Sequence, residues 1–107
     1  MALQAAFIFL ADGADPARHR STIRTPQVDL TVIGAATYAA AEKTAQTLVN
    51  EGVQAIELCG GFGINGTARI ARAVAGKAVI GVVRFDGHPG LGGQSGDSVF
   101  ETAGTLT

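Results

Sequence analysis

The chain has 107 residues, of which 47% are hydrophobic and 16% are charged, and its formal net charge is −1. This length allows one domain with a modest core. A near-neutral charge offers no basic stripe for a phosphate backbone, so nucleic acid is not expected as a partner. The single cysteine excludes an internal disulfide and a multi-cysteine zinc site.

The low charged fraction also bears on assembly and location. A small domain with so few charges exposes apolar area when it is a monomer, so we expect a homo-oligomer. The apolar run at residues 5–11 follows no basic segment and is too short to cross a bilayer. It predicts a first strand and not a signal peptide, which favours a cytoplasmic protein with no membrane partner.

The first half of the chain predicts two strands and a helix. Residues 3–10 are continuously apolar, which is typical of a strand covered on both faces. Asp-Gly and Asp-Pro turn signals predict a loop over residues 11–26. Residues 27–33 begin with apolar and polar side chains in alternation, which predicts a strand with one wetter side. A helix is expected over residues 37–50, with Thr37 as its N-cap.

The second half predicts two more strands and one helix. Residues 55–58 form a short apolar run that ends in a glycine-rich turn, and a helical pattern follows over about residues 67–75. In this pattern Arg69 is expected to lie off the buried face. Residues 78–85 predict the last strand, and the many glycines of residues 86–97 predict a long loop.

Together these elements predict an α/β fold, with a single small domain over residues 1–100 and a C-terminal tail at 101–107. The order β-β-α-β-α-β gives a four-stranded, mostly parallel sheet with two helices, because right-handed crossovers make the strands around each helix parallel. The orientation of the first strand stays open. If the crossovers place both helices on one face, a partner chain must cover the other.

Polar residues gather where the predicted strands end. Ligands bind beyond the carboxyl ends of parallel strands, and a strand that turns through glycines into a helix presents N–H groups to an anion. Glu57 and Cys59 end one strand, and Arg84 and Asp86 end the next, so we expect these pairs to lie close. The remaining candidates lie in the turn and the flanking loops: Gly60, Gly61, Gly63, His19, Arg20 and His88.

Each of these groups also has a structural interpretation. Glu57 and Arg84 could be an interior ion pair. Cys59 could be a small buried apolar residue, or a nucleophile whose thiolate is favoured at a helix N-terminus. His88 could be part of a surface turn, and His19 a solvated loop residue.

The turn also contains a weak dinucleotide signature. Residues 61–66 fit G-x-G-x-x-G between a strand and a helix, and Asp86 follows about twenty residues later. The second mononucleotide-binding half is missing from so small a chain. Nucleotide or dinucleotide binding therefore stays an alternative. No Walker A loop and no metal-ligand spacing occur, so neither a metal nor another cofactor is expected.

Three segments carry a resemblance to a known family. Residues 5–10 (AAFIFL), 55–63 (AIELCGGFG) and 83–93 (VRFDGHPGLGG) resemble a family of short bacterial proteins known only as a domain of unknown function. The similarity covers nearly the whole chain, through about Phe100. The resemblance implies a free-standing bacterial protein and no particular activity.

The residues themselves lead to two hypotheses. In the first, a small carboxylate or phosphate binds at the strand ends, held by Arg84 and the N–H groups of the glycine turn. Cys59, Asp86 and His88 would supply acid–base chemistry for a lyase or isomerase step that needs no cofactor. In the second, the protein is a non-catalytic oligomeric binding or assembly protein, and the glycine-rich loop is a contact between subunits.

Overall fold

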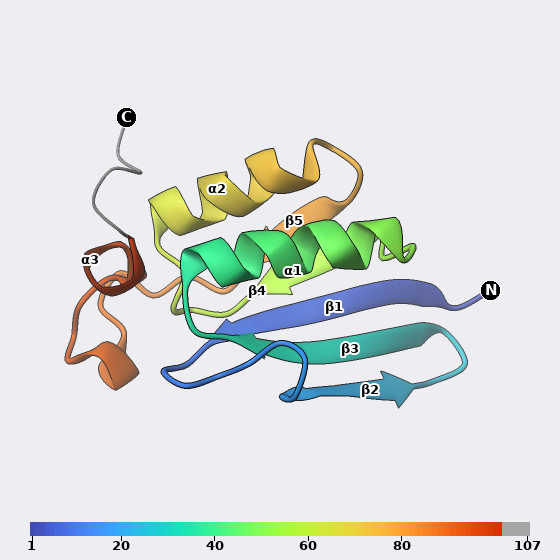
Figure 1. Ribbon diagram of the computed structural model, residues 1–107, viewed down its shortest axis with the longest axis horizontal. Coiled ribbons are helices and arrows are strands. Elements are labelled where there is room, and N and C mark those ends of the chain that lie inside the picture. Colours follow the sequence, from blue (N-terminus) through green and yellow to red (C-terminus); the bar gives the residue numbers. More distant parts are fainter. Residues whose placement is uncertain (102–107) are drawn as a thin grey trace.

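A five-stranded sheet with helices packed on one side forms the centre of the fold (Figure 1). The computed structural model describes residues 1–101. Its strands are β1 (Leu3–Leu10), β2 (Arg20–Arg24), β3 (Val28–Ala35), β4 (Ala55–Leu58) and β5 (Val79–Val82). Its helices are α1 (Tyr38–Asn50), α2 (Ile64–Val74) and α3 (Gly96–Phe100), with a 3-10 turn at Pro89–Leu91.

The strands lie in the order β2-β3-β1-β4-β5. Strand β1 pairs in parallel with both β3 and β4, and β4 pairs in parallel with β5. This settles the orientation of the first strand, which the sequence left open. The α/β class is confirmed, but the expected four strands and two helices were too few.

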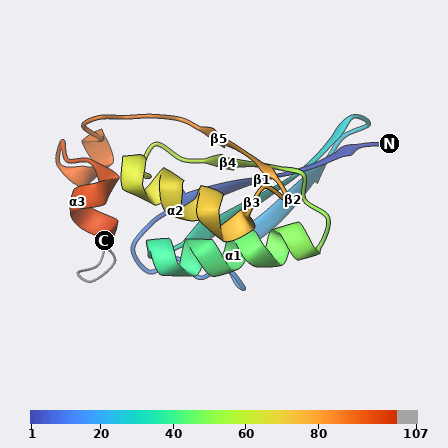
Figure 2. The ribbon, with the colours of Figure 1, turned by 90° about the horizontal axis from the view of Figure 1, so that it is seen from above.

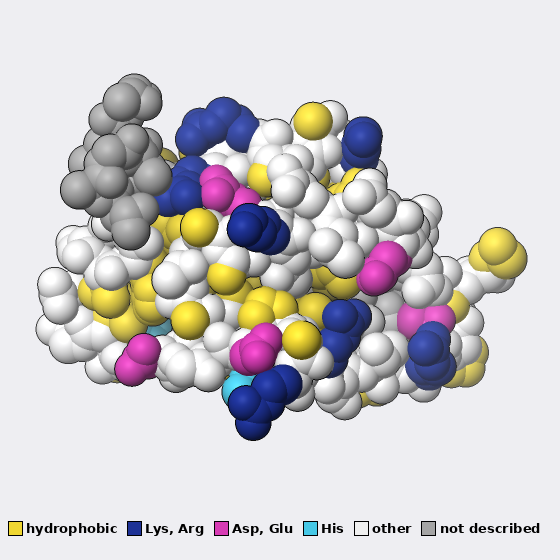
Figure 3. Space-filling model, in the orientation of Figure 1, with side chains coloured by type: hydrophobic (Ala, Val, Ile, Leu, Met, Phe, Trp, Pro, Cys, Tyr) yellow, Lys and Arg dark blue, Asp and Glu magenta, His cyan; other side chains and the backbone are white. Residues whose placement is uncertain are grey.

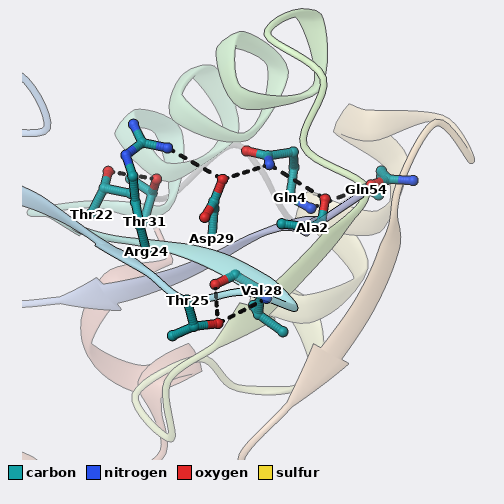
Figure 4. Close-up of polar contacts among 9 residues, drawn as sticks. All are labelled: Ala2, Gln4, Thr22, Arg24, Thr25, Val28, Asp29, Thr31 and Gln54. Atoms are coloured by element: carbon teal, nitrogen blue, oxygen red, sulfur yellow. Dashed lines mark hydrogen bonds and ion pairs between the residues drawn. The ribbon is translucent and has the colours of Figure 1, made fainter.

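The additional strand, β2, lies within the segment predicted to be a loop. It pairs antiparallel with β3 at the edge of the sheet and places charged side chains at both of its ends. Figure 4 shows two of its contacts with β3: the hydroxyls of Thr22 and Thr31 are 2.9 Å apart, and Arg24 pairs with Asp29 at 3.3 Å. Edge strands tolerate charged residues because one side stays in water, so the basic composition concealed the strand.

The two long helices lie on the same side of the sheet (Figure 2). Helix α1 has the expected N-cap, because the Thr37 side chain accepts a hydrogen bond from the Ala40 N–H at 3.0 Å. Helix α2 begins three residues earlier than the pattern predicted. The expectation for Arg69 was wrong: its side chain is buried between the helices, where its Nε and Nη2 donate to both carboxylate oxygens of Glu42 at 2.9 Å.

Side chains that face the helices form the core, whereas the opposite face of the sheet stays partly exposed. Alternation along β1 shows this clearly, since Ala6 and Ile8 are fully buried and their neighbours Phe7 and Phe9 are not. In the described part of the chain no helix is long and apolar enough to cross a membrane.

The third helix was also unexpected. The segment after β5 passes the carboxyl ends of the strands and ends in α3, beside the start of α2 (Figures 1 and 2). Of the tail predicted at 101–107, Glu101 accepts a hydrogen bond from the Asn65 side chain at 2.9 Å. Residues 102–107 lie outside the described residues.

Candidate functional site

The glycine turn after β4 does present backbone N–H groups to an anion, but the anion belongs to the chain. The N-cap residue of helix α2 is Gly63, which has no side chain to accept a capping hydrogen bond. The amides of Asn65 and Gly66 donate instead to the two carboxylate oxygens of Asp97, at 3.1 and 3.2 Å. Asp97 lies in the first turn of α3. The carboxylate of one helix therefore caps the N-terminus of another.

Tyr38 links this carboxylate to the turn. Its hydroxyl donates to Asp97 Oδ1 at 2.9 Å and accepts from the Gly63 N–H at 3.0 Å. Burial raises the pKa of the Tyr38 phenol above its ordinary value, the Gly63 N–H opposes that shift, and Asp97 adds to it. The phenol therefore stays neutral and can keep donating to the carboxylate.

The glycines at this junction allow close packing between segments. A side chain at Gly63 would collide with the Asp97 carboxylate, and one at Gly66 with the Tyr38 ring. A side chain at Gly96 would collide with the Gly61 carbonyl oxygen. The G-x-G-x-x-G segment thus surrounds an internal carboxylate at the position where a dinucleotide phosphate would lie.

Cys59 lies at the start of the turn, at the end of the β1–β4 pair. Its sulfur accepts the N–H groups of Leu10 at 3.4 Å and Gly61 at 3.3 Å. The amides of Gly61 and Gly63, which were expected to hold a ligand, therefore bond to Cys59 and Tyr38. Gly60 is covered by the Phe85 ring.

The ion pair that was one interpretation of Glu57 and Arg84 does not form, and the two residues do not lie close together as expected. Glu57 pairs in register with Gly81 and lies on the face of the sheet away from the helices. Arg84 lies beside α2 and pairs with Asp86, whose Oδ1 is 2.9 Å from its Nη2 and 3.0 Å from its Nε. The strand register explains the error, because it places odd-numbered β4 and even-numbered β5 side chains on opposite faces.

The two histidines make local contacts. His88 caps the 3-10 turn, with its Nδ1 accepting the Gly90 N–H at 3.0 Å, and its ring centre is 4.8 Å from that of Phe85. His19 closes the loop before β2, with its Nδ1 accepting the Asp15 N–H at 2.9 Å. Both arrangements match the structural interpretation of these residues, and no described hydrogen bond joins either histidine to Cys59 or Asp86.

Two pockets contain the predicted cations. A small one of about 150 Å³ lies between α2 and the end of β5, and it includes Gly63, Thr67 and Arg84 in its lining. A larger one of about 330 Å³ lies between α1, β3 and the loop before β2. Its lining residues are Asp15, Pro16, Ala17, Arg20, Ile33, Ala40, Lys43, Thr44, Thr47 and Leu48.

The larger pocket combines an apolar floor with a cationic rim. Ile33 and Leu48 are buried in the floor, whereas the side chains of Arg20 and Lys43 are exposed. Figure 3 shows apolar side chains gathered in the hollow beside α1, with basic and acidic side chains at its edges. Sequence reasoning selected Arg20 and missed Lys43, which lies on the helix one turn after Ala40. Within residues 1–101, no group of three His, Cys, Asp or Glu side chains could hold a metal ion.

Comparison with known proteins adds the family. A family model described as a family of unknown function, DUF6506, matches residues 3–98. The chain belongs to this family. The resemblance noted from the sequence is thereby confirmed, and the DUF6506 match spans every strand, α1, α2 and the first three residues of α3. Neither the comparison with curated proteins nor that with solved structures finds a match.

Proposed function

We propose that this protein binds a small organic anion, a carboxylate with an apolar body, in the pocket between α1 and Arg20. One observation carries the proposal: Arg20 and Lys43 line the same pocket, over an apolar floor. In the described part of the chain, no carboxylate lies within ion-pair distance of either cation. Asp15 also lines the pocket, and its carboxylate accepts the Ala17 N–H at 2.9 Å.

The size and lining of the pocket indicate the class of ligand. Its volume of about 330 Å³ is at the lower end of the range for small-molecule sites. The side chains of Ile33, Ala40 and Leu48 favour an apolar body, which gains about 25 cal/mol for each Å² removed from water. The carboxylate would lie at the rim, where Arg20 can bind it in a bidentate manner. An inorganic phosphate has no apolar part that could contact the floor of the pocket.

This pocket supports binding better than catalysis. None of the three candidate catalytic residues, Cys59, Asp86 and His88, lines it. Their roles in a lyase or isomerase step stay predictions. The pocket beside α2 is a second candidate for the anion, because Gly63 and Arg84 line it together as the sequence suggested. Arg84 is already paired with Asp86, which lowers its value as a ligand-binding group.

The thermal unfolding midpoint of the protein, measured with benzoate and with inorganic phosphate, tests the proposal. At ten times its Kd, a ligand stabilises the native state by about 1.4 kcal/mol, which raises the midpoint of a domain of this size by roughly 6–10 °C. We expect the rise with benzoate, its loss in Arg20→Gln, and its retention in Arg18→Gln, a matched exposed arginine outside the pocket.

Three outcomes would contradict this assignment. No rise with benzoate or phosphate overturns anion binding. An equal rise in wild type and Arg20→Gln removes the pocket from consideration. A rise lost in Arg84→Gln and kept in Arg20→Gln places the anion beside α2 instead.

A further inference from the structure

The face of the sheet that points away from the helices is almost entirely apolar. Strand alternation and pairing register assign its residues. The apolar members are Leu3, Ala5, Phe7, Phe9, Ile23, Val28, Leu30, Val32, Ala55 and Val79. Its polar side chains are Ser21 and Glu57. Both long helices lie on the other side (Figure 2). We call this surface the open face.

The open face is comparable in size with the largest apolar patches found on monomeric proteins. The strands contain 8, 5, 8, 4 and 4 residues, 29 in all. Each strand residue covers about 16 Å² of sheet, from a rise of about 3.3 Å and a strand spacing of about 4.8 Å. The face therefore has a flat area of roughly 460 Å², which is within the range of the largest apolar patches on monomers and typical of interaction sites.

This area is close to what a stable dimer needs. Two copies of the open face would bury roughly 900 Å² of flat area. Side chains such as Phe7 and Leu30 protrude from the sheet, so the accessible area that is buried is larger than the flat area. Specific interfaces bury about 1,200–2,000 Å² in total. Two sheets whose inner faces are apolar pack about 10 Å apart with their strands nearly aligned. A second open face has the shape and chemistry for this packing.

The two polar side chains show how such a pair would be oriented. Pairing register places five residues in one row across the sheet, in the order Ser21, Val32, Phe7, Glu57 and Gly81. Phe7, on the central strand, is the middle of this row. A two-fold axis along β1 therefore brings the Ser21 position of one copy over the Gly81 position of the other, next to Glu57.

We propose that the open face binds the open face of a second copy of this chain, with the two-fold axis along β1. Glu57 then accepts a hydrogen bond from the hydroxyl of Ser21 in the other copy. Gly81 has no side chain and leaves room for this contact, since its nearest neighbour on that side is the Glu57 side chain, 3.6 Å from an added Cβ. Both polar groups of the open face are thereby satisfied, twice in each dimer.

The alternative two-fold axis, across the strands, is less favourable. It stacks β4 on β4 and brings the two Glu57 carboxylates toward each other in an apolar interface, where like charges cost free energy. The proposed arrangement also leaves the pocket beside α1 free, because that pocket lies on the helix side of the sheet. A variant can therefore lose dimerisation and keep anion binding, or lose anion binding and keep dimerisation.

Cysteine cross-linking tests the orientation. In the triple variant Ser21→Cys, Glu57→Cys, Cys59→Ser, the two new cysteines are three strand spacings apart within one chain, about 14 Å. A disulfide needs a Cα–Cα separation of about 4.4–6.8 Å. In the proposed dimer the cysteine at position 21 of one copy and that at position 57 of the other are one strand spacing apart on sheets about 10 Å apart, so the cross-linker is a short bis-maleimide and not an oxidant. We expect covalent dimers with this reagent. In the control Ser21→Cys, Cys59→Ser the two cysteines of a dimer are four strand spacings apart, about 19 Å, so the control should stay uncross-linked. Cross-linking of that control would overturn the proposed axis.

Sedimentation equilibrium tests the interface itself. We expect the wild-type protein to be a dimer at micromolar concentration, and Ile23→Glu to raise the dissociation constant at least 100-fold. Ile64→Glu is the matched control, because Ile64 is 61% exposed on α2 and Ile23 is 57% exposed on the open face. A wild-type monomer at 100-fold higher concentration, or a dimer of unchanged affinity in Ile23→Glu, would overturn the proposal. Both substitutions are at exposed sites, so the folded chain is retained.

Discussion

Substitution of Asp97 by alanine should destabilise the protein strongly, although Asp97 belongs to the short helix α3. The carboxylate accepts three hydrogen bonds, from the amides of Asn65 and Gly66 and from the Tyr38 hydroxyl. Loss of an N-cap costs about 1 kcal/mol. Hydrogen bonds to a charged group are worth about 1.5–3 kcal/mol, and the hydroxyl of buried Tyr38 would lose its acceptor. Because these terms overlap, we expect a loss of about 2–3 kcal/mol in the free energy of unfolding.

Urea denaturation measures this loss as a fall in the midpoint at constant m-value. Asp97→Asn should lose less, because the amide oxygen can still accept a bond while the favourable charge at the helix N-terminus, worth about 0.3–1 kcal/mol, is gone. Asp86→Ala is the control: its carboxylate is exposed and pairs with the exposed Arg84 and with no group of α2, so the midpoint should change little. A loss of less than about 0.5 kcal/mol in Asp97→Ala, the range of ordinary surface substitutions, would refute the capping role.

Two further predictions concern the same junction. Because the pKa of Tyr38 is raised in the folded state, its contribution to stability is complete below the unfolded value of about 10 and is lost as the pH rises through the folded value. The free energy of unfolding should fall more steeply above pH 10 in wild type than in Tyr38→Phe. Tyr38 is the single tyrosine, so absorbance titration reports its ionisation directly, and a midpoint near 10 in the folded protein would contradict the prediction. Gly96→Ala should destabilise by about 1–3 kcal/mol through overpacking against the Gly61 carbonyl, whereas Ser98→Ala, at an exposed site, should leave the urea midpoint unchanged.

The sequence predicted an element correctly where a clear pattern of apolar residues or a capping residue marked it. Continuous apolar runs located β1, and the threonine cap located the start of α1. Strand β2 was missed because its charged ends and polar residues resemble a loop, and only its pairing with β3 makes it a strand. Arg69 was misplaced because helical periodicity treats an arginine as solvated, whereas Glu42 on the neighbouring helix compensates its burial.

The sequence showed that the glycine turn would present N–H groups, but not which group would accept their hydrogen bonds. The turn after β4 was expected to present the Gly61 and Gly63 amides to a bound anion, whereas its Asn65 and Gly66 amides bond to a carboxylate of the chain itself. That the anion would be Asp97 could not be inferred, because the contact joins residues 32 positions apart and depends on where α3 lies. Residues on neighbouring strands were expected to converge, but the register that separates Glu57 from Arg84 is a property of the assembled sheet.

The capping of α2 by Asp97 also affects the order of folding. Asn65 precedes its partner by 32 residues, so a growing chain contains the helix before it contains the cap. At synthesis rates of about 5–20 residues per second, this delay is roughly 2–6 s, which is far longer than a helix needs to form. During that interval the first turn of α2 has only water to satisfy its amides. A contact that holds the glycine turn to the rest of the protein therefore forms late in synthesis, when the segment that contains α3 is added.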